Sequence, residues 1–510
     1  MITRKFSKKS SLAVLTGAAV VALVAWAGLG LTGYVLADQP DGNGQHHHGG
    51  GGGDTTPPDP VTDLAVNPLA TTFDSIALDW TATGDDGLTG TATSYDVRYS
   101  TGNPAEPPFN GDLETWFGAA SQAQGEPAPQ APGSAESFTV TGLLDGTTYY
   151  LALKVADEAG NASGPSNVVS ETTPQAPPGA WLNETVDDPG RVAFYTALAY
   201  DPAHNPAIAY TDEGSGRIKF AQWNGSAWAI ENVGTGTAGV DLAFDPATGQ
   251  PVMSFSRSSK LVFARKVDSA WHTRSIENKD ALNDVTSLAF DSSGMPCISY
   301  LFRGRSGALL KLARFDGSSW STEVVDDGAI ARYNSLVFAP DGNPSIAYSD
   351  VTGGGSHFDT LKFAHWNGAS WDIEIVETAE VAGVFAALAY DPATGFPAIV
   401  HRDDQQNLRF ARWNGTFWEI ETVDTGRNTN CTLAYLAPAT PVISYSNSAA
   451  AELRFARWDG FAWQIEVVQR NVSVKYQTSL AIEPVAGTPS ISYGDNKSNA
   501  LKFARKMPEP

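Results

Sequence analysis

The chain has 510 residues, of which 42% are hydrophobic and 17% charged, and its formal net charge is −23. A chain of this length holds several domains or one large repeat array, and its acidity excludes nucleic acid as a probable class of partner, because phosphate backbones are repelled. Two cysteines are too few for a disulfide framework or a cysteine-rich zinc site, whereas 49 glycines and 31 prolines favour a turn-rich β protein.

Residues 1–37 are expected to be an export segment. Basic residues near the start precede an uncharged, mostly apolar run from Ser10 to Ala37. This order is typical of a secretory signal peptide, with cleavage expected before Asp38. The apolar run is also long enough to span a membrane, so an uncleaved anchor helix is the alternative. Both place the rest of the chain outside the cytoplasm, at the cell surface or beyond, and confine membrane contact to this segment.

Residues 38–58 are rich in Gly, His and Pro and contain no large apolar side chain. Such a composition predicts a flexible linker, because nothing in it can nucleate a core. The three consecutive histidines 46–48 are interpreted as part of this polar spacer. No cofactor and no metal site is expected.

Residues 59–175 contain short segments in which apolar and polar side chains alternate, such as Ser94–Ser100 and Tyr149–Val155. This pattern predicts a β-sandwich. The segment resembles a fibronectin type III domain in its Pro-rich entry PPDPVTDLAV, in Trp80 as the core tryptophan and in Tyr149 of GTTYY as the tyrosine corner. It departs from that family in the long Pro-, Ala- and Gln-rich stretch 101–136. No Arg-Gly-Asp is present, so the resemblance implies no integrin binding.

Residues 177–510 contain seven copies of one unit. Each copy has an outermost strand that starts at a tryptophan, an inner strand like ALAYDP, a Pro-led strand like NPSIAYSD and a strand like LKFAHW. Four short strands in about 47 residues is the period of a β-propeller blade, so seven sets predict seven blades. The tryptophans recur at intervals of 43 to 51 residues and are Trp181, Trp228, Trp271, Trp320, Trp371, Trp418 and Trp463.

The ends of the array do not coincide with the ends of a blade. It starts with an outermost strand at Trp181 and stops after a third strand, Leu501–Arg505. We therefore expect the first strand to complete the last blade, which leaves no unpaired edge. The units resemble repeats of uncharacterised secreted bacterial propellers, with marks such as SLAFD, ISY and LKFARWNG. That resemblance implies fold and export, and no activity. The fold class expected is all-β: a fibronectin type III β-sandwich, a seven-bladed β-propeller and an N-terminal hydrophobic helix.

The binding surface is expected on the face that carries the second-to-third and fourth-to-first loops. The opposite face consists of short turns such as Asn-Gly, whereas this face carries segments that differ between copies: 187–194, 278–284, 301–310 and 350–360. Aromatic rings that start inner strands, beside carboxylates that end second strands, would suit a glycan. The alternative is that the rings pack between blades and the aspartates cap turns. The candidate ligand-binding residues are Tyr195, Tyr333, Phe385, Tyr476, Asp212, Asp350 and Asp403.

No catalytic arrangement is recognisable. The histidines fall at different points of different copies, and no Gly-x-Ser-x-Gly motif is present. Tryptophans five residues apart, such as Trp366 and Trp371, are interpreted as packing across a hairpin, and Cys297 and Cys431 as small buried residues without a disulfide.

The sequence thus favours an exported or surface-tethered, non-enzymatic binding or adhesion protein that recognises a glycan or an extracellular protein. A secreted glycan-cleaving hydrolase or lyase and a structural cell-envelope protein are the alternatives. The oligomeric state is left open.

Overall fold

The computed structural model describes residues 54–86, 89–278, 285–304, 307–327, 332–350, 360–378 and 384–509. The expected signal or anchor, most of the linker and parts of the segments at 278–284, 301–310 and 350–360 lie outside the described residues. Within the described ranges, no helix has the length and apolar character needed to cross a membrane.

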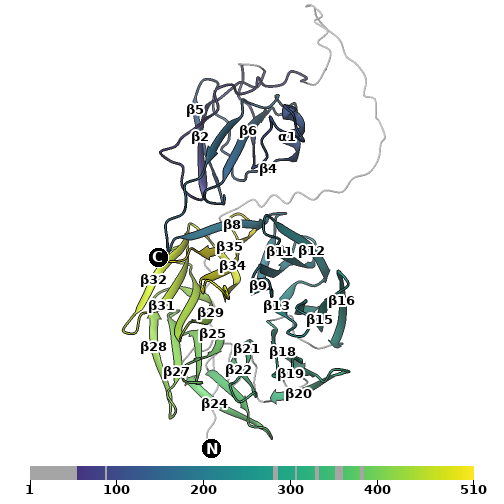
Figure 1. Ribbon diagram of the computed structural model, residues 1–510, viewed down its shortest axis with the longest axis vertical. Coiled ribbons are helices and arrows are strands. Elements are labelled where there is room, and N and C mark those ends of the chain that lie inside the picture. The colour runs from purple at the N-terminus through teal and green to yellow at the C-terminus, as the bar shows by residue number, and fades with distance from the viewer. Residues whose placement is uncertain are drawn as a thin grey trace, which may run out of the picture. The chain divides into compact units, whose positions relative to one another are not determined.

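Residues 54–176 contain two antiparallel sheets with a common core (Figure 1). One has the strand order β1-β2-β5 and the other β4-β3-β6-β7. Alternate side chains of both sheets, including Leu78, Val97 and Leu151, are buried between them. The strands are β1 (Ala65–Val66), β2 (Ser75–Thr81), β3 (Ser94–Ser100), β4 (Ser121–Gln122), β5 (Ala135–Thr141), β6 (Thr148–Ala156) and β7 (Val169–Thr172).

Two residues singled out in the sequence, Trp80 and Tyr149, are buried in this core. The Trp80 ring meets Tyr95 edge-on at 5.0 Å between centroids, and the Tyr149 hydroxyl accepts a hydrogen bond from the Leu144 backbone N–H at 3.0 Å. The long stretch 101–136 holds a helix that the sequence did not predict, α1 (Leu113–Ala119), whose N-terminus is capped by the Asp112 carboxylate. Its Trp116 is buried in a small core of its own.

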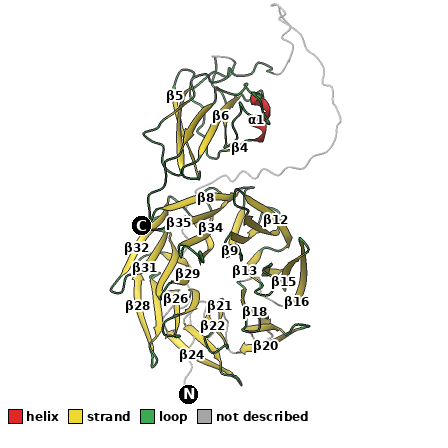
Figure 2. Ribbon diagram, in the orientation of Figure 1, coloured by secondary structure: helices red, strands yellow, loops and turns green. Residues whose placement is uncertain are grey.

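Residues 181–506 form seven four-stranded antiparallel sheets that are arranged as blades in a ring (Figure 2). We number the blades 1 to 7 by their inner strands. Blades 1 to 3 are β9 (Val192–Tyr200), β10 (Pro206–Asp212), β11 (Arg217–Trp223), β12 (Trp228–Thr235); β13 (Ala238–Phe244), β14 (Pro251–Arg257), β15 (Lys260–Val267), β16 (Ala270–Glu277); and β17 (Ser287–Phe290), β18 (Pro296–Gly304), β19 (Gly307–Phe315), β20 (Trp320–Asp326). Blades 4 to 6 are β21 (Arg332–Phe338), β22 (Pro344–Asp350), β23 (Thr360–Trp366), β24 (Trp371–Thr378); β25 (Val384–Tyr390), β26 (Pro397–Arg402), β27 (Leu408–Trp413), β28 (Trp418–Asp424); and β29 (Asn428–Leu436), β30 (Thr440–Asn447), β31 (Glu452–Trp458), β32 (Trp463–Arg470). Blade 7 is β33 (Val474–Ile482), β34 (Pro489–Asp495), β35 (Ala500–Lys506) and β8 (Trp181–Asp187).

The ring closes through the first strand of the array, as expected. Strand β8 pairs antiparallel with β35, so that Glu184 lies opposite Phe503 and Trp181 opposite Lys506. Each inner strand contacts the inner strand of the next blade, and β33 of blade 7 contacts β9 of blade 1. The early and the late end of the array therefore share one sheet.

The repeated tryptophans join neighbouring blades. Trp271, at the start of an outermost strand, packs edge-on against Phe220 of the preceding blade at 5.3 Å, and its indole N–H donates to the Glu231 carboxylate at 2.8 Å. The tryptophans five residues apart meet across their hairpin, with Trp366 and Trp371 at 5.7 Å. The interpretation of these tryptophan pairs as packing across a hairpin is confirmed. The tryptophan–phenylalanine contact between neighbouring blades recurs at Trp181–Phe455, Trp228–Phe503, Phe263–Trp320, Phe363–Trp418 and Phe410–Trp463.

Candidate functional site

A cavity of about 420 Å³ occupies the channel near the starts of the inner strands. All seven inner strands, or the residues just before them, contribute to its wall. Its volume falls in the range of small-molecule pockets, roughly 300–1,000 Å³.

The four aromatic residues that the sequence proposed line this cavity. Tyr333 and Phe385, in blades 4 and 5, lie 4.7 Å apart between ring centroids. Tyr195 and Tyr476, in blades 1 and 7, are stacked at 6.0 Å, and Tyr476 is 56% exposed. Because blades 4 and 5 lie across the ring from blades 7 and 1, the two aromatic pairs occupy opposite sides of the channel mouth.

Bulges at the starts of the inner strands set the direction of these rings. In blade 5, Val384 pairs with Arg402 and Ala387 with Val400, so one extra residue is inserted on the inner strand. Phe385, at this bulge, has φ 61°, and Tyr333 at the corresponding bulge of blade 4 has φ 51°. A positive φ is costly for a bulky residue, and bulges commonly re-aim side chains beside functional sites. Asn430 takes the same position in blade 6 with φ 57°, where an asparagine is tolerated well.

The three aspartates proposed with these rings do not line the cavity, and their assignment needs correction. The Asp212 carboxylate lies 3.0 Å from Lys219 Nζ and accepts from the Ser215 backbone N–H at 2.9 Å. Asp350 pairs with Lys362 at 2.5 Å, and Asp403 accepts from the Asn407 backbone N–H at 2.8 Å. Each carboxylate is committed to an ion pair or a turn inside its own blade. The turn-capping alternative describes Asp212 and Asp403, whereas Asp350 forms an ion pair with a lysine.

Asp212 belongs to a recurring group that we call a boundary cluster. In the cluster between blades 7 and 1, the Tyr210 hydroxyl donates to Asp187 of β8 at 2.5 Å, and Lys219 Nζ lies 3.0 Å from both Asp187 and Asp212. Burial foremost, and then the Asp187 charge, raises the pKa of Tyr210. In each boundary cluster, an acidic residue of one blade contacts a tyrosine and a basic residue, lysine or arginine, of the next blade. Related groups are Tyr300, Glu277 and Lys311; Tyr348, Asp326 and Lys362; and Tyr445, Asp424 and Arg454.

Sequence reasoning missed the carboxylate that does line the cavity, Asp241 of β13. One of its oxygens accepts from the backbone N–H of Leu288 in the next blade at 2.7 Å, and the other from the Leu242 N–H at 2.8 Å. Burial raises the pKa of Asp241 to about 6, against the opposing effect of these hydrogen bonds and of the Ser287 hydroxyl. An alignment of the units offers a signal, since DLAF in blade 2 stands where blade 3 has SLAF.

Neutral polar groups make up the rest of the polar lining. Hydroxyl groups come from Thr286, Ser335 and Ser479, among others, and amides come from Asn334, Asn430 and Gln477. The Oε1 atom of Gln477 is buried and has no hydrogen-bond partner among the described residues. None of the described lining residues is Lys, Arg or His.

Both cysteines are buried free thiols, as the sequence suggested. Cys431 reaches the cavity wall, where its thiol donates to the Phe385 carbonyl oxygen at 3.0 Å. Burial raises the pKa of Cys431 to about 12, so it is a protonated, unreactive thiol at neutral pH.

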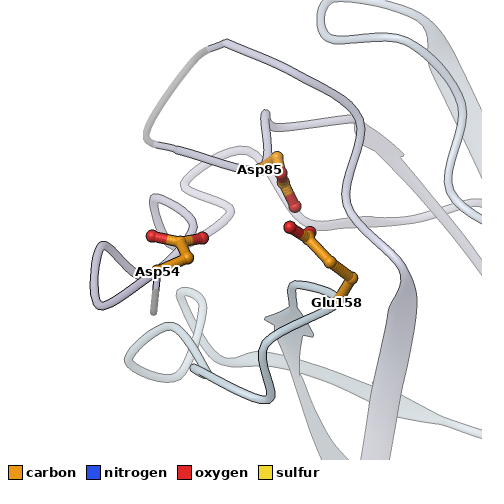
Figure 3. A group of neighbouring side chains, drawn as sticks. All are labelled: Asp54, Asp85 and Glu158. Carbon is orange, nitrogen blue, oxygen red and sulfur yellow. The ribbon is translucent and has the colours of Figure 1, made fainter. Parts of the chain in front are cut away.

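A separate acidic group lies in the sandwich. Figure 3 shows Asp54, Asp85 and Glu158, with the carboxylates of Asp85 and Glu158 turned toward one another. One carboxylate oxygen from each of the three residues lies within 4.8 Å of those from the other two. Burial, followed by the Glu158 carboxylate, raises the pKa of Asp85. Because calcium takes about 6–8 oxygen ligands, three carboxylates alone do not make a built calcium site.

Comparison with known proteins assigns no family. No family model matches the chain, and no curated protein matches it. Similar solved structures include an Aleuria aurantia lectin mutant in complex with Fucα1-6GlcNAc, at 15% identity and TM-score 0.40, over 56% of this chain and 99% of that chain. Others are AofleA from Arthrobotrys oligospora, at 15% identity and TM-score 0.40 over 57% and 90%, and a mutant NanB sialidase from Streptococcus pneumoniae, at 9% identity and TM-score 0.40 over 86% and 95%. At this level of similarity no ligand or activity is assigned, and the propeller architecture rests on the sheets and the ring closure described above.

Proposed function

We propose that the protein is an exported or surface-tethered, non-enzymatic binding protein whose propeller channel takes a carbohydrate. The two aromatic pairs at the mouth of the cavity carry this proposal. Aromatic rings stack on the apolar faces of sugars, while the hydroxyl and amide groups between them match sugar hydroxyls. The bulges that hold Tyr333 and Phe385 at positive φ support it further, because backbone strain of this kind concentrates at functional sites.

The lining favours binding over cleavage. Most glycoside hydrolases work with two carboxyl groups that flank the scissile bond. Among the described lining residues, Asp241 is the one carboxylate. Product release from a bound glycan, measured by mass spectrometry of the incubated sugar, would contradict the non-enzymatic proposal and support the hydrolase or lyase alternative.

Replacing the strained rings tests the site. Phe385→Asn and Tyr333→Asn should each weaken glycan binding about ten- to a hundredfold, as loss of a buried aromatic anchor usually does. Asparagine tolerates positive φ and already occupies the corresponding bulge as Asn430, so both variants should fold. A glycan array on the purified protein would identify the sugar, and isothermal titration calorimetry would measure the loss.

Asn367→Ala and Asp245→Ala, in short turns on the opposite face, serve as controls. Binding losses in these controls, or parental affinity of Phe385→Asn and Tyr333→Asn at unchanged melting temperature, would contradict the proposed site. An array without any binding glycan would favour the structural alternative.

We infer that residues 59–175 are a fibronectin type III-like spacer. The three-stranded and four-stranded sheets, Trp80 in the core and the Tyr149 hydrogen bond support this assignment. We propose that it and the Gly-rich linker hold the propeller away from the cell surface.

Export predicts a defined start of the mature protein. If the signal peptide is cleaved, mass spectrometry of the exported protein should show a chain that begins at Asp38. A membrane-bound species that retains residues 1–37 would establish the anchor instead. A full-length species confined to the cytoplasm would contradict both.

A further inference from the structure

We propose that the carbohydrate bound in the channel carries a protonated amine, as in a glycan with non-acetylated amino sugars, and that Asp241 binds this ammonium group. This inference rests on the proposed function of the same cavity and concerns the class of sugar. Its test distinguishes failure of the amine preference from failure of carbohydrate binding itself.

The structural role of the Asp241 position requires no charge. At the corresponding position of three other blades, a serine hydroxyl accepts the backbone N–H of a leucine in the next blade: Ser287 from Leu336 at 3.0 Å, Ser335 from Leu388 at 3.1 Å and Ser479 from Leu198 at 3.0 Å. Asp241 makes the same contact with Leu288 at 2.7 Å. A neutral hydroxyl is therefore sufficient for this contact between blades, and the carboxylate in blade 2 adds a charge that the contact does not require.

That charge lies in an environment where it is costly. Burying a carboxylate is unfavourable unless a cation or several hydrogen bonds compensate it. Asp241 is compensated by the backbone N–H groups of Leu242 and Leu288 and by the Ser287 hydroxyl, while no described lining residue is cationic. A carboxylate accepts about four hydrogen bonds, so Asp241 keeps acceptor capacity for a ligand. A ligand ammonium group would supply both the missing cation and the missing donor.

The rest of the cavity also suits a cation. An ammonium group has three donors and no acceptor, so it matches a wall whose polar groups are one carboxylate together with hydroxyl and amide groups. Aromatic faces attract cations as well, and Tyr195, Tyr333 and Tyr476 line the same cavity. A sugar carboxylate close to Asp241 would meet a like charge, which disfavours an acidic group at this part of the cavity wall.

The test compares oligomers of glucosamine with oligomers of N-acetylglucosamine of equal length, at a pH where the free amine is protonated. Isothermal titration calorimetry on the full chain should show at least tenfold tighter binding of the amine form. Asp241→Ser should abolish this preference and melt no lower than the parent, because the serine keeps an acceptor for Leu288 and removes a half-buried charge. Asp241→Asn, of the same shape, provides a second neutral variant should the serine variant fail to fold.

Ser335→Thr is the matched control, since it changes a lining side chain at the corresponding position of blade 4, keeps a hydroxyl for the Leu388 N–H and leaves the Asp241 charge in place. It should keep the preference for the amine. Equal affinity of the parent for both oligomers, or a preference that survives in Asp241→Ser and Asp241→Asn, would overturn the inference and leave carbohydrate binding intact. Absence of binding to either oligomer, together with an array without any binding glycan, would overturn both proposals.

Discussion

Deleting residues 180–187 should destabilise the whole propeller rather than trim one strand from it. Strand β8 is the outermost strand of blade 7, and its loss exposes the edge of β35. Trp181 packs edge-on against Phe455 of blade 6 at 5.2 Å and donates to Glu466 at 2.9 Å, while Val186 is buried in a core shared by blades 7 and 1. Losing one buried tryptophan alone costs about 3–5 kcal/mol, so the deletion should cost more.

Differential scanning calorimetry and light scattering would measure the effect. We expect a much lower melting temperature and association through the exposed β35 edge. A deletion of equal length in the linker, 46–53, is the control and should leave the melting temperature unchanged. An unchanged melting temperature and a monomeric state after removal of 180–187 would refute closure of the ring through β8.

Lys219→Met should destabilise the propeller strongly, although it changes a single side chain. The Lys219 ammonium lies 3.0 Å from the carboxylates of Asp187 and Asp212, and all three side chains are at least 86% buried. Burial alone would lower the pKa of Lys219, but the hydrogen bonds and charges of the two aspartates outweigh it and raise the pKa. Removing the cation leaves two buried carboxylates close together, and breaking such a buried pair costs about 3–5 kcal/mol.

The pH dependence of this loss identifies its cause. Burial alone would raise the pKa of Asp212, but the Ser215 hydrogen bonds and Lys219 hold it below its usual value. The folded parent therefore loses this stabilisation as the pH falls through that lowered pKa. Denaturant unfolding should show a large difference between Lys219→Met and the parent at pH 7, which narrows below about pH 4 as carboxylates are protonated.

Arg412→Met provides a comparison for Lys219→Met. Arg412 and Glu419 form an ion pair with side chains 50% and 41% exposed, and such exposed pairs contribute at most about 1 kcal/mol. Equal losses in the two variants, or a loss in Lys219→Met that does not change with pH, would show that the buried ion pairs do not stabilise the seam between blades 7 and 1.

The repeat pattern made the fold predictable, because Trp181 and its counterparts mark one strand in every blade. It also placed the four aromatic residues, since all of them lie where inner strands begin. The roles of the aspartates were not predictable in the same way. Whether Asp212 faces a ligand or Lys219 depends on the register between β10 and β11 and on an acid supplied by the preceding blade.

Asp241 escaped notice for a different reason. In a chain with 56 acidic residues, one more aspartate on a strand is unremarkable. Its significance comes from its cavity-lining position and from the serines that take the same position in other blades. The bulges could not be predicted from the sequence either, because a phenylalanine such as Phe385 does not indicate a positive φ.

The pairing of β8 with β35 also governs when the propeller can be finished. Lys502 and Thr185, hydrogen-bonded at 2.6 Å across this pair, are 317 positions apart in the chain. Contacts between such distant residues slow folding, because the intervening chain must be ordered before they form. During synthesis β8 leaves the ribosome long before β35, so blade 7 cannot be completed until nearly the whole chain has been synthesised. We therefore expect the ring to be completed late in folding, and a chain truncated before β35 lacks the strand with which β8 pairs.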